Sequence, residues 1–503
     1  MAPALAPLLG ALALIPSRPF AAADEPSPLL TPQPAAPTEP LPNRGTLVDP
    51  ASAADPGSWS IGEWLGYGTM LLFAAALTII AVTTLYWMLH AWRSTGHLKN
   101  TGFAAVPLPA EHSFTLLVPG RHEEEVMGQT LDRLAEQDHP DFEIIAIVGH
   151  DDPGTERVVR EAAARHPDLI KVVVDDSVPK NKPKALNRAL QIARGDVVGV
   201  FDAEDEVHPR LLTLVDSRFT ESGADVVQGG VQLMNFQSSW WSLRNVLEYY
   251  FWFRSRLHFH ANSRFIPLGG NTVFVKKTWL DWSEGWDDGC LAEDCELGVR
   301  LSSAGATVVV AYSPEVVTRE ETPGTLQSLY KQRTRWNQGF LQVLKKGEWR
   351  KLPTFRQRMF ARYLLSMPFL QAATGLLIPV SVLLVLFAKV PAPIALLTFI
   401  PLAPTIVTLA VEASGLGEFG RLYGQKVRLR DYARLILGTF PYQIFLGLAA
   451  VRSVFREWKG DHSWEKTEHT GAHRSEEIAE AAPVSVDLPD RAPELVLQNG
   501  ATR

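Results

Sequence analysis

The sequence contains very little cysteine and has no excess of positive charge. Of its 503 residues only Cys290 and Cys295 are cysteines, which excludes a disulfide scaffold and a four-cysteine metal site. The formal net charge is -7, so the chain carries no basic footprint for nucleic acid. Charged residues are scarce, at 20%, whereas hydrophobic residues reach 46%. This balance indicates long apolar segments joined to an ordinary soluble domain.

Residues 1–60 lack the apolar periodicity of a folded domain. Prolines recur between residues 26 and 56, and aromatic residues are few before Trp59. We therefore expect a disordered, Pro/Ala-rich tail. Its first 16 residues are similar to the apolar part of a signal peptide, but they lack the Lys or Arg that usually stands ahead of the apolar run.

Residues 67–92 contain no Asp, Glu, Lys or Arg, and this run exceeds the roughly 20 residues that span a hydrocarbon core. The sequence therefore predicts a transmembrane segment within residues 61–98. Residues 1–60 carry two positive and five negative side chains, whereas Arg93 and Lys99 follow the apolar run. The positive-inside rule then places the N-terminus outside the plasma membrane and the following domain in the cytoplasm.

Residues 99–325 read as a soluble α/β domain. Short apolar runs that suit buried strands lie at residues 114–118, 142–148, 170–174, 197–201 and 226–228, and helical patterns lie between them, as at 130–137 and 184–193. The alternation predicts a doubly wound sheet. Ligands of such sheets bind beyond the carboxyl ends of the strands, so the residues that follow each run are the first candidates for chemistry.

The C-terminal third returns to apolar sequence. Residues 326–362 are expected at the membrane interface and residues 363–455 as transmembrane helices, with apolar runs at 363–388, 393–413 and 435–451. The third run includes Pro441 and Gln443 and is followed by basic residues, so both a spanning and a non-spanning arrangement stay open. Residues 456–503 are polar and are expected to be a largely disordered tail.

Charged and polar motifs follow the predicted strands. They are Pro119 to Glu125, the pair Asp151 and Asp152, the N-K-P-K-A-L-N run with Lys182 and Asn187, the F-D-A-E-D run with Asp202 and Glu204, the A-E-D run with Glu293 and Asp294, and Q-R-T-R-W at 332–336. Taken singly, most of them also fit an acidic helix start, a Pro-Gly turn, a solvated basic loop or a membrane anchor. The exception is the group of carboxylates at 202–205, for which a metal site is favoured. Their hard oxygen ligands suit Mg²⁺ or Mn²⁺ bridging phosphates.

The order of these motifs between membrane segments resembles the family 2 membrane glycosyltransferases, the group of bacterial cellulose and hyaluronan synthases. The resemblance covers about residues 110–345 well and the membrane segments loosely. It implies a GT-A fold, inversion at the anomeric carbon and a nucleotide-sugar donor.

The resemblance also implies roles for individual residues. Asp151 or Asp152 would contact the uridine, Lys182 the diphosphate, and Asp202 with Glu204 would replace the D-x-D metal motif of the family, although Asp205 could be the second ligand instead. Asp294 matches the general base, with Glu293 beside it and Ala292 in place of the usual Thr. The remaining substrate-binding candidates are Glu123, Asn187, Gln332, Arg333, Arg335 and Trp336.

These implications predict a membrane-embedded, Mg²⁺- or Mn²⁺-dependent enzyme that extends a β-linked polysaccharide from a UDP-sugar, with UDP-glucose as the default donor. The growing glycan would be the acceptor, and export through the membrane helices, with or without an accessory subunit, would extend this function. Two alternatives stay open. One is a non-processive transferase that glycosylates a polyprenyl phosphate or a glycolipid, and the other is an inactive membrane scaffold or transporter.

Overall fold

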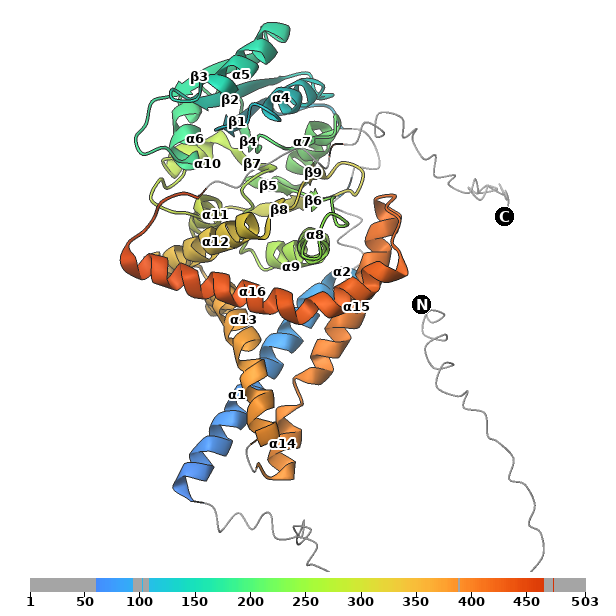
Figure 1. Cartoon of the computed structure of the whole chain (residues 1–503). Coiled ribbons are helices and arrows are strands. Elements are labelled where there is room, and N and C mark those ends of the chain that lie inside the picture. Colours follow the sequence, from blue (N-terminus) through green and yellow to red (C-terminus); the bar gives the residue numbers. More distant parts are fainter. Residues whose placement is uncertain (1–59, 94–101, 103–107, 388–389, 466–473, 475–503) are drawn as a thin grey trace, which may run out of the picture. The chain divides into compact units, whose positions relative to one another are not determined.

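The computed structural model describes residues 60–93, 102, 108–387, 390–465 and 474 (Figure 1). The expected Pro/Ala-rich tail and signal-like start lie outside the described residues, apart from Ser60.

The sheet that carries the predicted motifs has seven strands in the order β3-β2-β1-β4-β7-β5-β8. Their bounds are β1 Phe114–Gly120, β2 Phe142–Gly149, β3 Ile170–Asp175, β4 Val197–Val200, β5 Val226–Gly229, β7 Val273–Lys276 and β8 Val308–Ala311. Strand β7 is antiparallel to both of its neighbours, and the other pairs are parallel. The five predicted strands and the α/β fold class are confirmed, whereas β7 and β8 were not predicted.

Apolar residues alternate across the two faces of this sheet. In β2, Ile145 and Ile147 join one core cluster, whereas Ile144 and Ala146 join the other. Helices α4 (Met127–Ala135), α5 (Pro153–Arg165) and α7 (Leu211–Ser222) cover the second face. Helices α6 (Lys182–Leu190), α10 (Lys277–Trp282) and α11 (Glu293–Ala304) contribute to the first. Because both faces are covered, the strands are continuous apolar runs, as the sequence suggested.

A second, two-stranded parallel sheet pairs β6 (Val231–Leu233) with β9 (Thr318–Glu320). It leads into α8 (Ser242–Phe251), a π-helical turn at Trp252–Arg256 and α9 (Leu257–Asn262). Arg244 of α8 pairs with Glu412 at 2.5 Å, and Arg254 pairs with Glu418. Both partners belong to α15 (Leu402–Leu422), so ion pairs join the sheet domain to an apolar helix.

The remaining elements are mostly long helices. They are α1 (Ile61–Met88), α2 (His90–Arg93), α12 (Leu326–Lys346), a 3-10 turn at Glu348–Lys351, α13 (Phe355–Phe387), α14 (Ala392–Thr398) and α16 (Leu429–Lys459). Three apolar stretches of the described residues are long enough to cross a membrane: Ile61–Met88, Ala392–Leu422 and Leu429–Lys459. Figure 1 shows α16 running across α13 and beneath α12, and α16 packs against both helices.

The ends of two helices have clear local causes. Helix α1 begins at Ile61, the first residue of the predicted segment 61–98, because Ser60 and Glu63 form a capping box at its N-terminus. The polar tail expected from residue 456 begins later, since α16 continues to Lys459 and ends at Gly460 with a φ of 69°.

Candidate active site

A cavity of about 700 Å³ opens at the carboxyl ends of the parallel strands and continues between α1, α13, α15 and α16. Most residues singled out in the sequence line it, namely Glu123, Lys182, Asp202, Glu204, Glu293, Asp294, Gln332, Arg333, Arg335 and Trp336. Asp151, Asp152 and Asn187 do not line it. Motifs spread over more than 200 residues of sequence therefore meet at one site.

The acidic loop, residues 202–206, follows β4 and brings carboxylates to the cavity. Asp205 is fully buried, and its carboxylate accepts hydrogen bonds from the Asp202 amide at 2.8 Å and from Asn271 Nδ2 at 3.0 Å. Burial raises the pKa of Asp205, and the nearby Glu320 carboxylate raises it further. Asp202 and Glu204 line the cavity, whereas Asp205 shapes the loop behind them.

Lys182 faces the acidic loop from the first turn of α6. Its ammonium group pairs with Asp202 and donates a hydrogen bond to the Gly270 carbonyl at 2.7 Å. Burial alone would lower the pKa of Lys182, but the surrounding carboxylates, led by Asp202 and Glu293, raise it overall. Lys182 is therefore a fixed positive charge at the cavity wall.

Glu293 and Asp294 begin α11 and also line the cavity. Burial and the neighbouring Asp294 carboxylate raise the pKa of Glu293 to about 7. Burial also raises the pKa of Asp294, although the Cys295 amide donates a hydrogen bond to its carboxylate at 2.7 Å. Carboxyl groups whose pKa values are raised toward neutrality are suited to accept a proton at physiological pH.

Helix α12 lies unusually close to this carboxyl pair. A Cβ atom added to Gly339 would lie 2.4 Å from Ala292 Cβ and 2.6 Å from the Ala292 amide nitrogen. Gln342 strengthens the contact, because its side-chain oxygen accepts a hydrogen bond from the Leu291 amide at 2.9 Å. The absent side chain at Gly339 therefore allows the Q-R-T-R-W helix to reach the loop that carries Glu293.

The four motif side chains on α12 are used differently. Arg333 donates to Asn245 and Glu248 of α8, and its guanidinium carbon lies 4.8 Å from the centre of the Trp336 ring. The buried Oε1 of Gln332 and the buried Nε atoms of Arg333 and Arg335 have no hydrogen-bond partner within the described part of the chain. Arg333 therefore braces the helix, whereas Gln332 and Arg335 retain hydrogen-bonding capacity toward the cavity.

Asp152 and Asn187 instead hold the protein's own backbone. Asp152 is the N-cap of α5, where it accepts from the Thr155 amide at 3.2 Å. Asn187 exchanges two hydrogen bonds with the backbone of Trp286, at 2.7 and 2.9 Å. Asp151 remains half exposed and pairs with Arg121 at 3.0 Å. Of these three predicted substrate ligands, Asp151 is the one whose carboxylate is not committed to the backbone.

Several cavity residues were missed from the sequence. Asp175, at the end of β3, lines the cavity near Lys180, and the rule that selected Asp151 would also have found it. Asn271 follows two glycines at a sharp approach to Asp294, since a Cβ on Gly270 would lie 3.1 Å from Asp294 Oδ2. Trp464, beyond the last apolar run, also lines the cavity, and no local pattern signals it.

The carboxylates fit a divalent cation only together with substrate. No group of three His, Cys, Asp or Glu side chains that could hold a metal occurs among the described residues. Asp202 and Glu204 line the cavity beside Lys182, and Mg²⁺ sites of this kind use one or two carboxylates plus substrate phosphates. The donor set therefore suits a cation that arrives with a diphosphate.

Comparison with known families gives a match over the sheet domain. Residues 109–339 match a family model described as glycosyltransferase like family 2. A mannosyltransferase structure from Pyrobaculum calidifontis, solved with GDP-Man and Mn²⁺, superposes with a TM-score of 0.51 at 19% identity. That match covers 78% of this chain and 99% of the mannosyltransferase, and it shows a shared fold.

Curated relatives include enzymes with two kinds of product. A beta-monoglucosyldiacylglycerol synthase from Synechocystis is 29% identical over 52% of this chain and 59% of its own length. A poly-beta-1,6-N-acetyl-D-glucosamine synthase from Staphylococcus epidermidis is 25% identical over 48% of this chain and 58% of its own length. The chain spans about half to two thirds of the length of the curated relatives that it matches first.

Proposed function

We propose that this chain, whose residues 109–339 match the family 2 glycosyltransferase model, is a membrane enzyme that transfers a sugar from a UDP-sugar to a membrane-borne acceptor. One observation carries this proposal. The Glu293–Asp294 pair, Lys182 and Asp202 line a cavity that continues between apolar helices. One cavity thus combines a proton acceptor, a positive charge for the donor diphosphate and space for the acceptor.

The proposed chemistry is a displacement with inversion. The acceptor hydroxyl attacks the anomeric carbon and gives its proton to Asp294, while the bond to the β-phosphate breaks and its electron pair leaves with UDP. Lys182 supplies fixed positive charge for the diphosphate, and Arg335 supplies a further donor. Asp151 and Asp175 are candidates for the uridine, since both lie at the carboxyl ends of strands.

Asp202 and Glu204 would hold Mg²⁺ or Mn²⁺ together with the diphosphate. The cation would supply Lewis-acid stabilisation of the negative charge that develops on the leaving group. Asp205 keeps both carboxylates in place through its bond to the Asp202 amide.

The membrane half of the cavity favours an acceptor with hydrocarbon chains. Its lining includes an aliphatic stripe on α1 together with apolar residues of the other helices, namely Leu77, Ile80, Ala81, Met88, Leu364, Met367, Pro368, Leu409 and Leu446. Thr405, Thr408 and Thr439 also line it, and each donates its hydroxyl to the backbone carbonyl four residues earlier. Gln371 and Gln443 add side-chain amides, so the lining is mainly, but not wholly, apolar. Such a lining suits a lipid better than a hydrated glycan. We therefore place a glycolipid or polyprenyl phosphate acceptor first.

A polysaccharide product is the second candidate, favoured by Trp336. Its ring lines the cavity next to Gln332 and Arg335 and could provide a stacking face for the terminal sugar of a growing chain. In this second proposal the product would be a β-linked polymer from UDP-glucose, exported with or without an accessory subunit.

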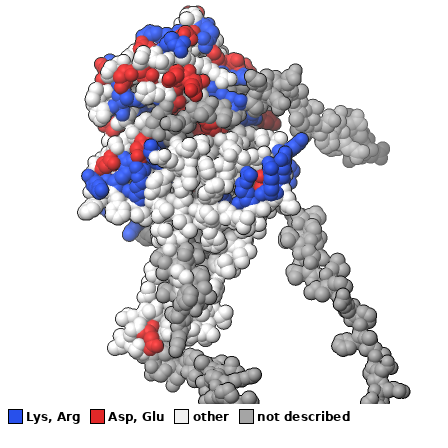
Figure 2. All heavy atoms as spheres, in the orientation of Figure 1, with Lys and Arg blue, Asp and Glu red and all other residues white. Residues whose placement is uncertain are grey.

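The charge distribution supports a cytoplasmic catalytic domain in a multi-pass plasma-membrane protein. Figure 2 shows mostly uncharged surface on the helices below the sheet domain and basic side chains over the corner between α15 and α16. That corner contains Arg421, Lys426, Arg428 and Arg430. Basic residues beside membrane segments mark the cytoplasmic side.

Product analysis tests the proposal. Purified protein in detergent with mixed lipids would be incubated with each UDP-sugar and Mn²⁺, and the labelled sugar would be followed into organic and aqueous phases. We expect label in the organic phase and equimolar UDP. A high-mass aqueous product digestible by a β-specific glycanase would instead support the polymer. Absence of turnover with every donor would favour the inactive scaffold or transporter.

A further inference from the structure

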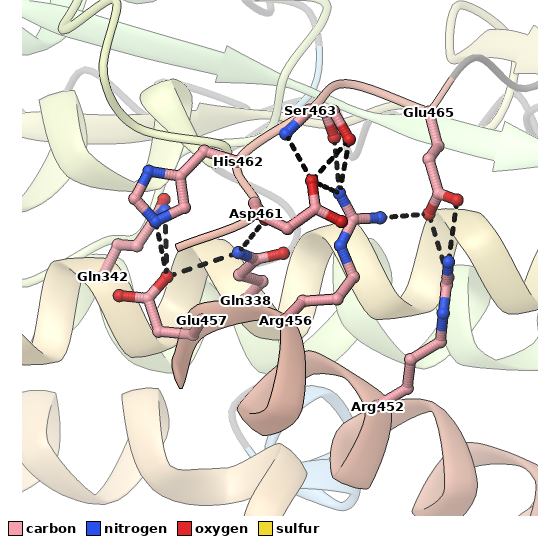
Figure 3. A network of polar contacts seen from close by, with 9 residues as sticks. All are labelled: Gln338, Gln342, Arg452, Arg456, Glu457, Asp461, His462, Ser463 and Glu465. Atoms are coloured by element: carbon pink, nitrogen blue, oxygen red, sulfur yellow. Dashed lines mark hydrogen bonds and ion pairs between the residues drawn. The ribbon is translucent and has the colours of Figure 1, made fainter. Parts of the chain in front are cut away.

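Residues 461–465, which follow α16, form a polar network with side chains of α12 and α16 (Figure 3). We call this contact the first docking. Gln338 of α12 donates to the Asp461 carbonyl at 2.8 Å, and Arg456 of α16 donates to the Ser463 carbonyl at 2.7 Å. Glu465 accepts two hydrogen bonds from Arg452, at 2.7 and 2.9 Å, and also pairs with Arg456. Bidentate arginine pairs of this kind hold a segment in one geometry.

This first docking brings Trp464 to the cavity. Its ring centre lies 5.6 Å from the guanidinium carbon of Arg335, and the side chain lines the cavity with Trp336. Residues 461–465 therefore extend the cavity wall beyond the matched family domain, which ends at residue 339.

Arg474 docks at a second place, on α4. Its guanidinium donates to the Val126 carbonyl at 2.9 Å, to Gln129 Oε1 at 2.8 Å and to Thr130 Oγ1 at 2.5 Å. With Gln129 it lines a small cavity whose other wall includes Asp205 and Glu206 of the acidic loop. Lys182 and Arg474 thus place positive charges on two different sides of the acidic loop.

Thr130 connects Arg474 to the acidic loop by a relay of hydrogen bonds. The Thr130 hydroxyl is fully buried and donates to the Ala203 carbonyl at 2.6 Å. Arg474 donates to that same hydroxyl oxygen. The two hydrogen bonds therefore connect the guanidinium, through the hydroxyl, to the carbonyl of Ala203, the residue between Asp202 and Glu204. Serial hydrogen bonds of this kind polarise and strengthen one another.

We propose that Arg474 is a positioning residue for the donor site, which fixes the acidic loop through Thr130 and offsets its negative charge from behind. The proposal rests on the proposed function, because it assumes that Asp202 and Glu204 hold the donor diphosphate and its cation. Donor binding then depends on the C-terminal segment as well as on the matched family domain.

Kinetics of Arg474→Ala test this role. We expect KM for the UDP-sugar and the Mn²⁺ concentration for half-maximal rate to rise about 3- to 30-fold, while kcat falls less. This is less than the roughly 10- to 100-fold for a charged hydrogen bond made directly to the ligand, because Arg474 acts through Thr130. Arg474→Lys keeps the positive charge but lacks the planar guanidinium that donates to three acceptors, so it should recover part of the loss. Arg157→Ala is the control, since Arg157 lies exposed on α5 in an ordinary surface pair with Glu161.

A double-mutant cycle tests the relay itself. Thr130→Val removes the hydroxyl at nearly constant shape, so Arg474→Ala should add little to KM in a Thr130→Val background. Fully additive effects would overturn the relay. A change of less than twofold in both KM and the Mn²⁺ requirement of Arg474→Ala would overturn the positioning role. A lower melting temperature accompanied by similar fold-changes in kcat, KM and the Mn²⁺ requirement would also overturn it, because that result indicates a general loss of structure.

Hydrogen exchange gives a readout that does not require turnover. The Asp202 amide donates to Asp205 Oδ2 at 2.8 Å and the Asp205 amide to the Asp202 carbonyl at 3.3 Å, so both should exchange slowly in the wild type. In Arg474→Ala we expect faster exchange in the peptide that covers residues 200–207. Unchanged exchange would contradict the proposal. Lack of turnover in the wild type would instead refute the proposed function and leave this measurement valid.

Discussion

Lys182 and Asp202 form an ion pair across the ligand edge of the sheet, between the start of α6 and the end of β4. The donor diphosphate and its cation would compete for these same two groups. The pair therefore presents a preassembled positive and negative charge, one for phosphate oxygens and one for the cation.

Removal of the Asp202 carboxylate should weaken metal and donor binding together. We expect Asp202→Ala to abolish most Mn²⁺-dependent activity and to lower UDP affinity about 10-fold or more, as for loss of a charged ligand. Glu204→Gln should act in the same direction. Isothermal titration with UDP and Mn²⁺ measures both effects.

Asp205 provides the comparison. Because Asp205 is buried and holds the Asp202 amide, Asp205→Ala should lower the melting temperature, which Glu204→Gln should leave nearly unchanged. Equal stability of Asp205→Ala and the wild type, with a larger loss of metal affinity than in Glu204→Gln, would make Asp205 the second ligand. Full activity in excess EDTA would contradict the cation site altogether.

The acid limb of the pH profile should report the carboxyl pair. The pKa of Glu293 is raised to about 7 by burial and by Asp294, so Glu293 gains a proton as pH falls through that value and the pair loses one negative charge beside the base Asp294. We expect kcat/KM to rise with pH up to about 7 and to level off above it. In Glu293→Gln the acid limb should move to lower pH. A flat wild-type profile between about pH 5.5 and 8.5 would contradict a role for this pair.

Gly339 should be intolerant of a side chain. Gly339→Ala places a Cβ 2.4 Å from Ala292 Cβ, and overpacking of this kind costs about 1–3 kcal/mol and displaces one of the two elements. We expect a lower melting temperature and a reduced kcat, because the displaced loop carries Glu293. Gly324→Ala is the matched control, since no atom lies within 4 Å of its added Cβ. Equal behaviour of the two variants would show that the contact at Gly339 relaxes freely.

Trp336 should serve the acceptor and not the donor. Trp336→Ala removes the ring that lines the cavity, so product formation should fall and acceptor KM rise, while the UDP affinity stays within about twofold. Trp282→Ala, at an exposed position on α10, controls for loss of a tryptophan. Loss of UDP binding in Trp336→Ala would place the ring in the donor site instead.

Much of the fold was predictable because the parallel strands are continuous apolar runs. The runs at 114–118 and 142–148 became β1 and β2 within two residues of their predicted ends. Strand β7, Val273–Lys276, escaped prediction because it runs directly into α10 without a turn to mark its end, and because its pairing depends on its place between β4 and β5.

The site was less predictable where one residue type serves two purposes. Asp152 and Asn187 have the chemistry of ligands, but the same side chains cap α5 and clamp Trp286, and local sequence does not separate these uses. Trp464 and Arg474 reach the site only through tertiary contacts, so no motif near them indicates a function.

Release of UDP by the purified wild type and by Asp294→Asn, measured side by side, tests the central claim most directly. The substitution keeps the shape and most hydrogen bonding of Asp294 but removes its basicity, so turnover should fall about 10²- to 10⁴-fold while UDP binding persists. Asp288→Asn, at an exposed position shortly before α11, should retain wild-type turnover. Wild-type UDP release with the predicted loss in Asp294→Asn supports a glycosyltransferase that uses this carboxylate as its base. Near-normal release from Asp294→Asn would contradict that account.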